Sequence, residues 1–239
     1  MNADRTKATT VGVLFISGTV AGVLSVVFTG PILNDPGYLV KVAANPNQMM
    51  LGAFCILVMG LALAMIPVTI FPILKRHHEP FALGYLVFRG GLETVTSLGV
   101  VASWLLLVTL AGEYASAGAA AGPHFQTLGA LLRHAAEISS NVMAIVFPIG
   151  AMMLYVVLYQ SKLIPRWLSV WGMIAVVLHL VSTGLLGLFN LSDPMSPVQT
   201  AANLPIFLQE MVMAVWLIVR GFNPSALASD SASVDLALP

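Results

Sequence analysis

The sequence predicts an all-α fold: a polytopic membrane helical bundle of six transmembrane helices, with its N- and C-termini in the cytoplasm. Of the 239 residues, 58% are hydrophobic and only 8% are charged, and the mean hydropathy is +0.92. Soluble domains carry about 25% charged residues, so this composition excludes an ordinary soluble domain. Apolar runs of about 20 residues recur, and such a run crosses the hydrocarbon core as a helix that satisfies its own backbone.

Charge and motif content exclude several functional classes. Ten basic and ten acidic residues cancel, so the chain presents no basic surface for nucleic acid. The single cysteine, Cys55, lies in an apolar run and excludes an internal disulfide or a thiolate-rich metal site. The HExxH, GxSxG, Walker A and CxxC signatures are missing. The sequence therefore identifies no catalytic residue and no metal site, and it leaves any cofactor unknown.

The first three spans are expected at 11–32, 48–74 and 81–111. The first contains an apolar run of about 20 residues, longer than the core of a cleaved signal peptide, so we expect it to be retained. In the second, Pro67 and Pro72 each remove a backbone donor, so its last turns should bend. The connections "NDPG" and "HHEP" are rich in helix breakers and separate the three runs.

The remaining spans are expected at 138–160, 167–189 and 204–222, and an interfacial helix is expected at about 124–137. Breakers again mark the connections, in "AAAGPH", "KLIPR" and "LSDPMSP". Residues 223–239 mix Ser, Ala, Pro and Asp without an amphipathic period, which predicts a disordered cytoplasmic tail.

Lysine and arginine residues in the short loops predict the orientation of residues 1–222, the transmembrane domain. With the N-terminus in the cytoplasm, the cytoplasmic side collects Arg5, Lys7, Lys75, Arg76, Lys162, Arg166 and Arg220. The opposite side keeps Lys41 and Arg133. This excess of basic residues favours six spans with both ends inside.

The segment "VFRGGLETV" places Arg89 and Glu93 inside the third apolar run, where charge is costly. Four residues apart on a helix, the two side chains share a face and can pair. Charged groups at this depth cost a few kcal/mol, so they normally face the bundle interior and have partners. Three interpretations remain open: an ion pair that fixes helix packing, a site for a ligand, proton or ion, and a lipid-headgroup contact.

Three more polar residues lie within apolar spans. Gln209 and Glu210 fall about 9 Å into the sixth span from the outer side, and His179 lies near the middle of the fifth. A lone buried histidine is more often a hydrogen-bonded packing residue than a ligand. Even so, Glu93, His179 and Glu210 have compatible depths on three helices, which suggests one shared pocket whose formation depends on how the helices face.

The segment "LLRHAAEISSN" lies at the outer end of the fourth span. Arg133, Glu137 and Asn141 follow i, i+4 spacing, while His134 and Glu137 follow i, i+3 spacing. One unbroken helix through this region would be about 55 Å long, more than a bilayer needs, so it either projects outside or breaks at the serines. Glu137 and Asn141 then form either a solvated interfacial cap or an outward-facing mouth.

Three stretches carry a resemblance to a known family: "FPILKRHHEPFALGYLVFRGGLETV", "YQSKLIPRWLSVWGMIA" and "LPIFLQEMVMAVWLIVRGF". They resemble an uncharacterised bacterial integral membrane family, domain of unknown function 4386, over most of residues 10–222. The matching positions are Arg89, Glu93, Pro165, Arg166, Trp167, Gln209, Glu210 and Trp216. Two positions depart from the family's pattern: Arg220 replaces an expected lysine, and Gly90–Gly91 replaces bulkier residues. The resemblance implies a six-helix protein of the bacterial inner membrane and no particular activity.

Three functional hypotheses follow. The leading one is a protein that binds or transports a small ligand or ion through a polar intramembrane pocket built from Arg89, Glu93, His179 and Glu210. The second is a non-catalytic accessory or scaffold subunit, with a membrane protein partner or a second copy of itself. The third is an intramembrane enzyme acting on a lipid or quinone, for which no nucleophile is evident. Under each hypothesis, the protein is embedded in the lipid bilayer, and no nucleic-acid partner is expected.

Overall fold

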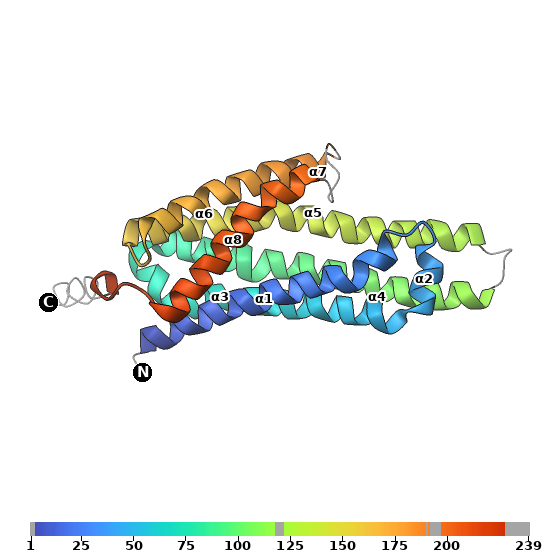
Figure 1. Ribbon diagram of the computed structural model, residues 1–239, viewed down its shortest axis with the longest axis horizontal. Coiled ribbons are helices and arrows are strands. Elements are labelled where there is room, and N and C mark those ends of the chain that lie inside the picture. The colour runs from blue at the N-terminus through green and yellow to red at the C-terminus, as the bar shows by residue number, and fades with distance from the viewer. Residues whose placement is uncertain (1–2, 118–121, 190, 192–196, 228–239) are drawn as a thin grey trace.

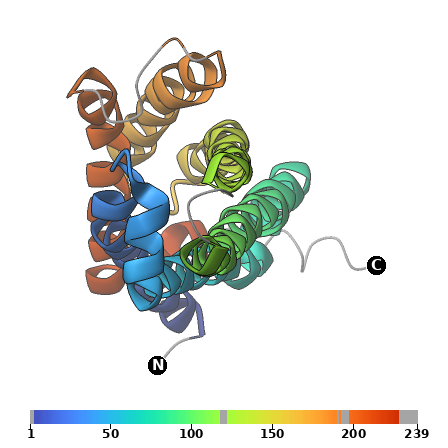
Figure 2. The same cartoon turned by 90° about the vertical axis from the view of Figure 1, so that its right-hand side faces the viewer.

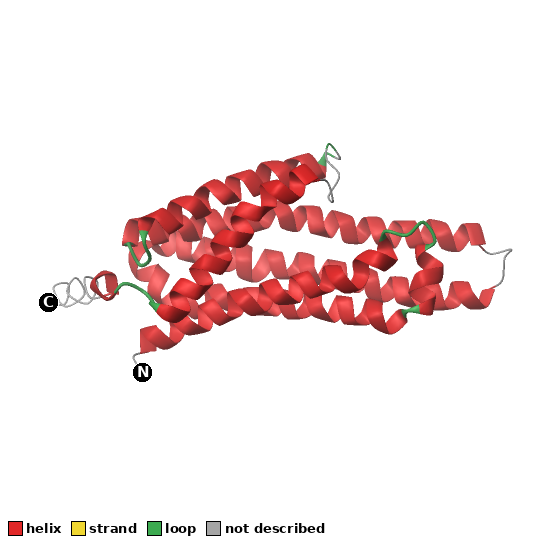
Figure 3. Ribbon diagram, viewed as in Figure 1, coloured by secondary structure: helices red, strands yellow, loops and turns green. Residues whose placement is uncertain are grey.

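The computed structural model describes residues 3–117, 122–189, 191 and 197–227, and among them it contains helices and turns but no strand (Figure 3). The all-α prediction is therefore confirmed. The elements in chain order are α1 (Ala3–Leu33), α2 (Tyr38–Ala44), α3 (Pro46–Tyr85), the π-helix η1 (Leu86–Leu92), α4 (Glu93–Ala117), α5 (Gly122–Ser161), α6 (Arg166–His179), the π-helix η3 (Leu180–Leu185), α7 (Leu186–Leu188) and α8 (Pro197–Val219).

Five helical stretches among the described residues are long and apolar enough to cross a membrane. One of them, Pro46–Ala117, has 72 residues and would measure about 108 Å if straight, against about 30 Å of hydrocarbon. It is broken at His78, where the backbone is extended (φ −159°, ψ 88°), two residues before Pro80. The chain turns back there, and α4 runs beside α3 in the opposite direction (Figure 1). This stretch contains two of the spans expected from the sequence, at 48–74 and 81–111. The count of six membrane crossings stays a prediction.

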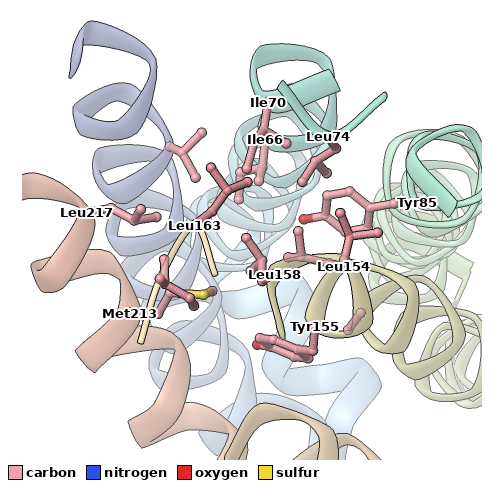
Figure 4. Packing of buried hydrophobic residues seen from close by; sticks show 14 of the residues in the cluster. Ile66, Ile70, Leu74, Tyr85, Leu154, Tyr155, Leu158, Leu163, Met213 and Leu217 are labelled. Atoms are coloured by element: carbon pink, nitrogen blue, oxygen red, sulfur yellow. The ribbon is translucent and has the colours of Figure 1, made fainter. Parts of the chain in front are cut away.

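Apolar side chains cover the outside of the bundle as well as its centre. Val27, Val95 and Val219 are all more than half exposed, as expected where the surrounding solvent is lipid. The main core lies where α1, α3, α5, α6 and α8 meet, and Figure 4 shows part of it, including Ile66, Leu154 and Met213. Seen from the end, the helices are grouped as a bundle rather than in separate layers (Figure 2).

The start of α1 and the end of α8 lie together at one end of the bundle. Arg5, near the start of α1, donates through Nη2 to the carbonyl oxygens of Ile218 (2.7 Å) and Val219 (2.9 Å) at the end of α8. These carbonyls have no partner within their own helix, so the guanidinium caps α8. The seven residues expected to face the cytoplasm are at this end, as the element ends show (Figure 1). That this end faces the cytoplasm remains a prediction from the positive-inside rule.

The helices differ from the expected segments in two places. The interfacial helix expected at 124–137 is the first part of the continuous helix α5. The helix does not break at the serines because Ser139 and Ser140 donate back to the carbonyls of Ala135 (2.8 Å) and Ala136 (3.0 Å). The short helix α2, within the connection between the first two spans, was not expected.

The expected tail also begins later than 223. Asn223 donates its backbone N–H to the carbonyl of Leu163 (2.9 Å), and Ala226 is buried against the core. Residues 223–227 therefore pack on the bundle, and residues 228–239 lie outside the described residues.

Candidate functional site

Arg89 joins two glutamates inside the bundle. Its Nη1 donates to both carboxylate oxygens of Glu93, at 3.1 and 3.0 Å, and its Nη2 donates to Oε1 of Glu210 at 3.3 Å. The side chains of Arg89, Glu93 and Glu210 are 3%, 5% and 14% exposed. We call these three residues the Arg89 cluster. It brings together η1, the start of α4 and the middle of α8.

The backbone that carries Arg89 is a π-helix rather than an α-helix. Such segments are rare and are frequent at functional sites, because the wider turn re-aims side chains. Gly90 and Gly91 lower the α-helical preference at this point. The hydroxyl of Thr94 donates to the Gly90 carbonyl (2.7 Å), and that of Ser97 donates to the Glu93 carbonyl (2.9 Å). Side-chain hydroxyls thus satisfy carbonyls where the helix changes type.

Apolar and aromatic groups enclose the guanidinium. The ring of Phe147, on α5, lies 4.5 Å from Cζ of Arg89, and the ring of Phe15, on α1, lies 6.0 Å away. Gly150 lets α5 approach this closely, since a Cβ there would lie 2.9 Å from Cβ of Phe88 and 3.2 Å from the backbone nitrogen of Arg89. The charges are therefore held among rings and backbone, where electrostatic interactions are strong.

Two polar atoms beside the cluster lack hydrogen-bond partners among the described residues. They are Nε of Arg89 and the hydroxyl of Tyr85, both buried. Tyr85 interacts electrostatically with Arg89 without making a hydrogen bond of good geometry. Nearly all buried donors in proteins are paired, so these two atoms are exceptions within a cluster that is otherwise hydrogen-bonded.

Gln209 lies next to Glu210 in sequence but has a different role. Its Oε1 accepts from the Tyr155 hydroxyl (2.6 Å), and its Nε2 donates to the carbonyl of Leu168 (3.1 Å). The side chain is fully buried, and Figure 4 shows the Tyr155 ring within the same core. These bonds link α5, α6 and α8, so Gln209 is a packing residue and its two polar ends are occupied.

His179 and Glu210 approach one region without touching. His179 Nδ1 is 2.9 Å from Oδ1 of Asn203, and Thr183 donates to the same oxygen at 2.9 Å. A carbonyl oxygen only accepts, so Nδ1 is the ring nitrogen that carries hydrogen. The Phe147 ring contacts both groups, with its centroid 5.2 Å from that of the histidine ring and 4.5 Å from Cζ of Arg89. Glu93 and Glu210 thus meet at Arg89, whereas His179 bonds to Asn203 and packs against Phe147.

Comparison with known proteins identifies the family. The family model described as "Domain of unknown function (DUF4386)" matches residues 10–221. The chain belongs to this family. No curated protein and no solved structure matches it. The matched range contains the whole Arg89 cluster, and the apolar helices make this DUF4386 protein a multi-pass membrane protein.

Glu137 and Asn141 lie far from the Arg89 cluster of this DUF4386 protein. Glu137 is 54% exposed and pairs with its own helix neighbours, His134 at 3.0 Å and Arg133 at 3.9 Å. Along α5 it is thirteen residues from Gly150, about 20 Å, and Asn141 is about 14 Å away. Among the described residues, no group of three or more histidine, cysteine or acidic side chains could hold a metal ion.

Some residues that complete the site of the DUF4386 chain were not predicted from the sequence. Tyr85 lies four residues before Arg89, and Asn203 lies seven before Glu210, so both share a helix face with a residue that was identified. Phe147 lacks such a signal, because an aromatic residue in an apolar span is ordinary core. Polar residues four or seven positions from each buried charge would have indicated Tyr85 and Asn203.

Proposed function

We propose that this protein is a carrier of the bacterial inner membrane, which binds a small cation or cationic solute at the Arg89 cluster in exchange for a proton. One observation carries the proposal: two carboxylates share one guanidinium inside an apolar bundle. If all three groups are ionised, the cluster has one negative charge in excess. An uncompensated buried charge costs several kcal/mol, so a proton or another cation should occupy the site.

The two carboxylates are unequal, and the difference favours Glu210 as the exchanging group. Glu93 uses both oxygens on Arg89 and is buried at the start of α4. Glu210 makes a single, longer contact, is more exposed, and lies on another helix. Removing Arg89 from Glu210 disrupts one hydrogen bond, whereas removing it from Glu93 disrupts two. Glu210 is therefore the carboxylate that can most easily accept a proton or turn towards a ligand.

The backbone near the cluster contains features that permit movement. The π-helix η1 carries Arg89, and the second π-helix, η3, directly follows His179. Such segments, and prolines within membrane helices, are common where transporter helices bend. Pro148 lies one residue from Phe147, and Pro205 lies between Asn203 and Glu210. These positions support a mechanism in which α5 and α8 bend around the aromatic ring.

The group of His179, Thr183 and Asn203 offers a polar route to the cluster. Asn203 and Glu210 are seven residues apart on α8, two helical turns on one face and about 10 Å along the axis. Phe147 contacts both polar groups. Rotation of this ring would connect them, which makes it the barrier that a bound cation or proton would pass.

The test is proton movement in proteoliposomes that enclose a pH-sensitive dye. Pulses of Na⁺, K⁺ and tetraethylammonium are applied from outside to the wild-type protein. We expect at least one of these cations to drive proton efflux, and Glu210→Gln to reduce that flux at least tenfold. The matched control is Glu113→Gln, an exposed glutamate near the outer end of α4, which should behave as wild type. No cation-driven flux in the wild type, or an unchanged flux in Glu210→Gln, would contradict the proposal.

A scaffold function is the second candidate, and the bonding of Gln209 favours it. This residue shows that the bundle uses buried polar groups to fix helix packing. Under this alternative, removing Arg89 alone should destabilise the protein strongly, while replacing Arg89, Glu93 and Glu210 together by apolar residues should be nearly neutral. In addition, the protein should copurify with a stoichiometric membrane partner and move no protons.

A further inference from the structure

We infer that the cytoplasmic end of the bundle contains a binding site for one anionic phospholipid, formed by the connection between α5 and α6 and the end of α8. A pocket of about 490 Å³ lies there. Its lining includes three cationic residues, Lys162, Arg166 and Arg220, and no carboxylate. None of the three forms an ion pair within the part of the chain that the structure describes. The site is separate from the Arg89 cluster and independent of the proposed transport.

Hydrogen bonds hold the two walls of the pocket together. Asn223 donates its backbone N–H to the Leu163 carbonyl (2.9 Å) and its side-chain amide to the Lys162 carbonyl (3.4 Å). Lys162 itself has φ +58°, a left-handed conformation that is uncommon for residues other than glycine. Such a conformation is retained where the surrounding structure requires it, often at a binding site. The pocket is thus a fixed feature rather than a gap between loose loops.

The cationic residues of the pocket come from two parts of the chain, the connection between α5 and α6 and the end of α8. Arg166 begins α6, whose N-terminal end carries partial positive charge from its free N–H groups. Its guanidinium lies over the Tyr159 ring at 5.0 Å, which orients the side chain. Arg220 follows the last turn of α8. Unpaired cations of this kind, at a helix N-terminus, match the charge and the multiple acceptor oxygens of a phosphate group.

An apolar groove continues from the pocket along α8, and it selects a lipid over a free anion. This groove, of about 420 Å³, is lined by Met211, Val212, Val215, Trp216, Val219 and Arg220. It shares Trp216 and Arg220 with the basic pocket. From Arg220 to Met211 it follows α8 for about 14 Å. A phosphate headgroup in the pocket would place an acyl chain in the groove, with Trp216 at the interface between them, where tryptophan is enriched.

This arrangement differs from the general attraction of basic residues to the inner leaflet. Basic pockets between membrane helices on the cytoplasmic side bind lipid headgroups, and each cation near the surface contributes to the affinity. Lys75 and Arg76, just before the kink at His78 in α3, are exposed cations at the same end of the bundle and lie outside the pocket. They supply a matched control, since neutralising them removes the same charge without altering the pocket.

The experiment is native mass spectrometry of the delipidated full-length protein, titrated with phosphatidylglycerol or phosphatidylcholine. We expect one phosphatidylglycerol to bind at least tenfold more tightly than phosphatidylcholine. The double variant Arg166→Gln/Arg220→Gln should weaken phosphatidylglycerol binding about 30-fold. Lys75→Gln/Arg76→Gln should weaken it less than threefold. Both variants change exposed side chains, and equal thermal stability would show that each is folded.

Three results would overturn the inference. The first is equal affinity for the two lipids, and the second is equal weakening by the two double variants, which would indicate general surface attraction. The third is displacement of the lipid by millimolar inorganic phosphate, which would identify a site for a soluble anion. A single substitution in the groove, Val215→Asn, adds a further readout. It should weaken lipid binding while leaving the basic residues unchanged.

Discussion

Two arginine–glutamate pairs with the same spacing have opposite environments in this protein. Arg89 and Glu93 are 3.0 Å apart, with side chains 3% and 5% exposed. Arg133 and Glu137 are 3.9 Å apart, with side chains 33% and 54% exposed. The first pair joins the π-helix η1, which carries Arg89, to the start of α4, and it recruits a second carboxylate from α8. The second lies within the α-helix α5, where Glu137 also pairs with His134 and Arg133 lies over the Tyr38 ring at 4.7 Å.

The four-residue spacing allows an ion pair to form, and the surroundings determine how much that pair contributes to stability. Water screens the outer pair and competes for its hydrogen bonds, so it contributes about 0–1 kcal/mol. The inner pair lacks that competition, and breaking it leaves a charge in apolar surroundings. A protein can therefore use the same four-residue spacing for solubility at one place and for charge storage at another.

The largest expected effect comes from removing the inner cation. Arg89→Met should lower the free energy of unfolding by about 3–5 kcal/mol, because two carboxylates lose their only cationic partner among the described residues. Arg133→Met should lower it by about 1 kcal/mol or less. Denaturation of both variants in the same detergent, followed by circular dichroism, measures the difference. Similar losses in the two variants would remove the distinction between the pairs.

The two inner glutamates should also differ from each other. Glu93→Gln should cost about 1–3 kcal/mol, since two charge-assisted hydrogen bonds are weakened. Glu210→Gln should be nearly neutral, because glutamine resembles the protonated carboxylic acid and its amide oxygen can still accept from Arg89. The same denaturation experiment compares them. A larger loss for Glu210→Gln would mean that Glu210 is the principal partner of Arg89 and not the exchanging group.

Close packing around the inner pair gives a prediction of similar or smaller size. Gly150→Ala should destabilise the protein by about 1–3 kcal/mol, since the new Cβ meets the Arg89 backbone nitrogen at 3.2 Å. Near the outer end of α4, a Cβ added at Gly112 would meet no neighbouring atom within 4 Å, so Gly112→Ala should be neutral or slightly stabilising. Thermal shifts of the two variants test whether the inner pair depends on this helix approach.

The smallest expected effect concerns a third ion pair, outside the spans, between Asp35 and Lys41. A hydrogen bond from Lys41 (2.6 Å), followed by one from the Gly37 N–H, lowers the pKa of Asp35 below its ordinary value of 3.8. The folded pKa is the lower one, so the pair stabilises the turn above pH 4 and loses this effect as the pH falls through the folded value. Hydrogen exchange of the Gly37 amide should stay constant from pH 7 to about pH 4 after correction for intrinsic rates. Protection that fades already near pH 6 would contradict the assignment.

Much of this architecture could be predicted from the sequence, because lipid imposes simple rules. Long apolar runs and the helix breakers between them locate the membrane spans, and Pro80 lies two residues after the reversal at His78 within α3. The inner pair stood out because Arg89 and Glu93 interrupt an apolar run. Their partner on α8 did not follow from spacing, since 121 residues separate Arg89 from Glu210 and only packing brings them together.

Other features depend on interactions that a local pattern does not reveal. The π-helix at Arg89 has an α-helical sequence pattern apart from its two glycines. The continuity of α5 depends on serine hydroxyls that can either break a helix or bond within it. Gln209 was a candidate ligand-binding residue from its position in an apolar span. In the structure, its amide hydrogen-bonds to the Tyr155 hydroxyl and the Leu168 carbonyl. In each case, the decisive contact comes from geometry rather than from residue type.

Infrared difference spectroscopy of the protein in lipid tests the central claim most directly, since it detects protonated carboxylic acids. At neutral pH, the exposed acidic side chains are ionised and silent in this region of the spectrum. The wild-type protein should show one protonated carboxylic acid, which is lost in Glu210→Gln and retained in Glu137→Gln. If the wild type shows no protonated carboxylic acid, or if the band is unchanged in Glu210→Gln, then the Arg89 cluster does not store an exchangeable proton at Glu210.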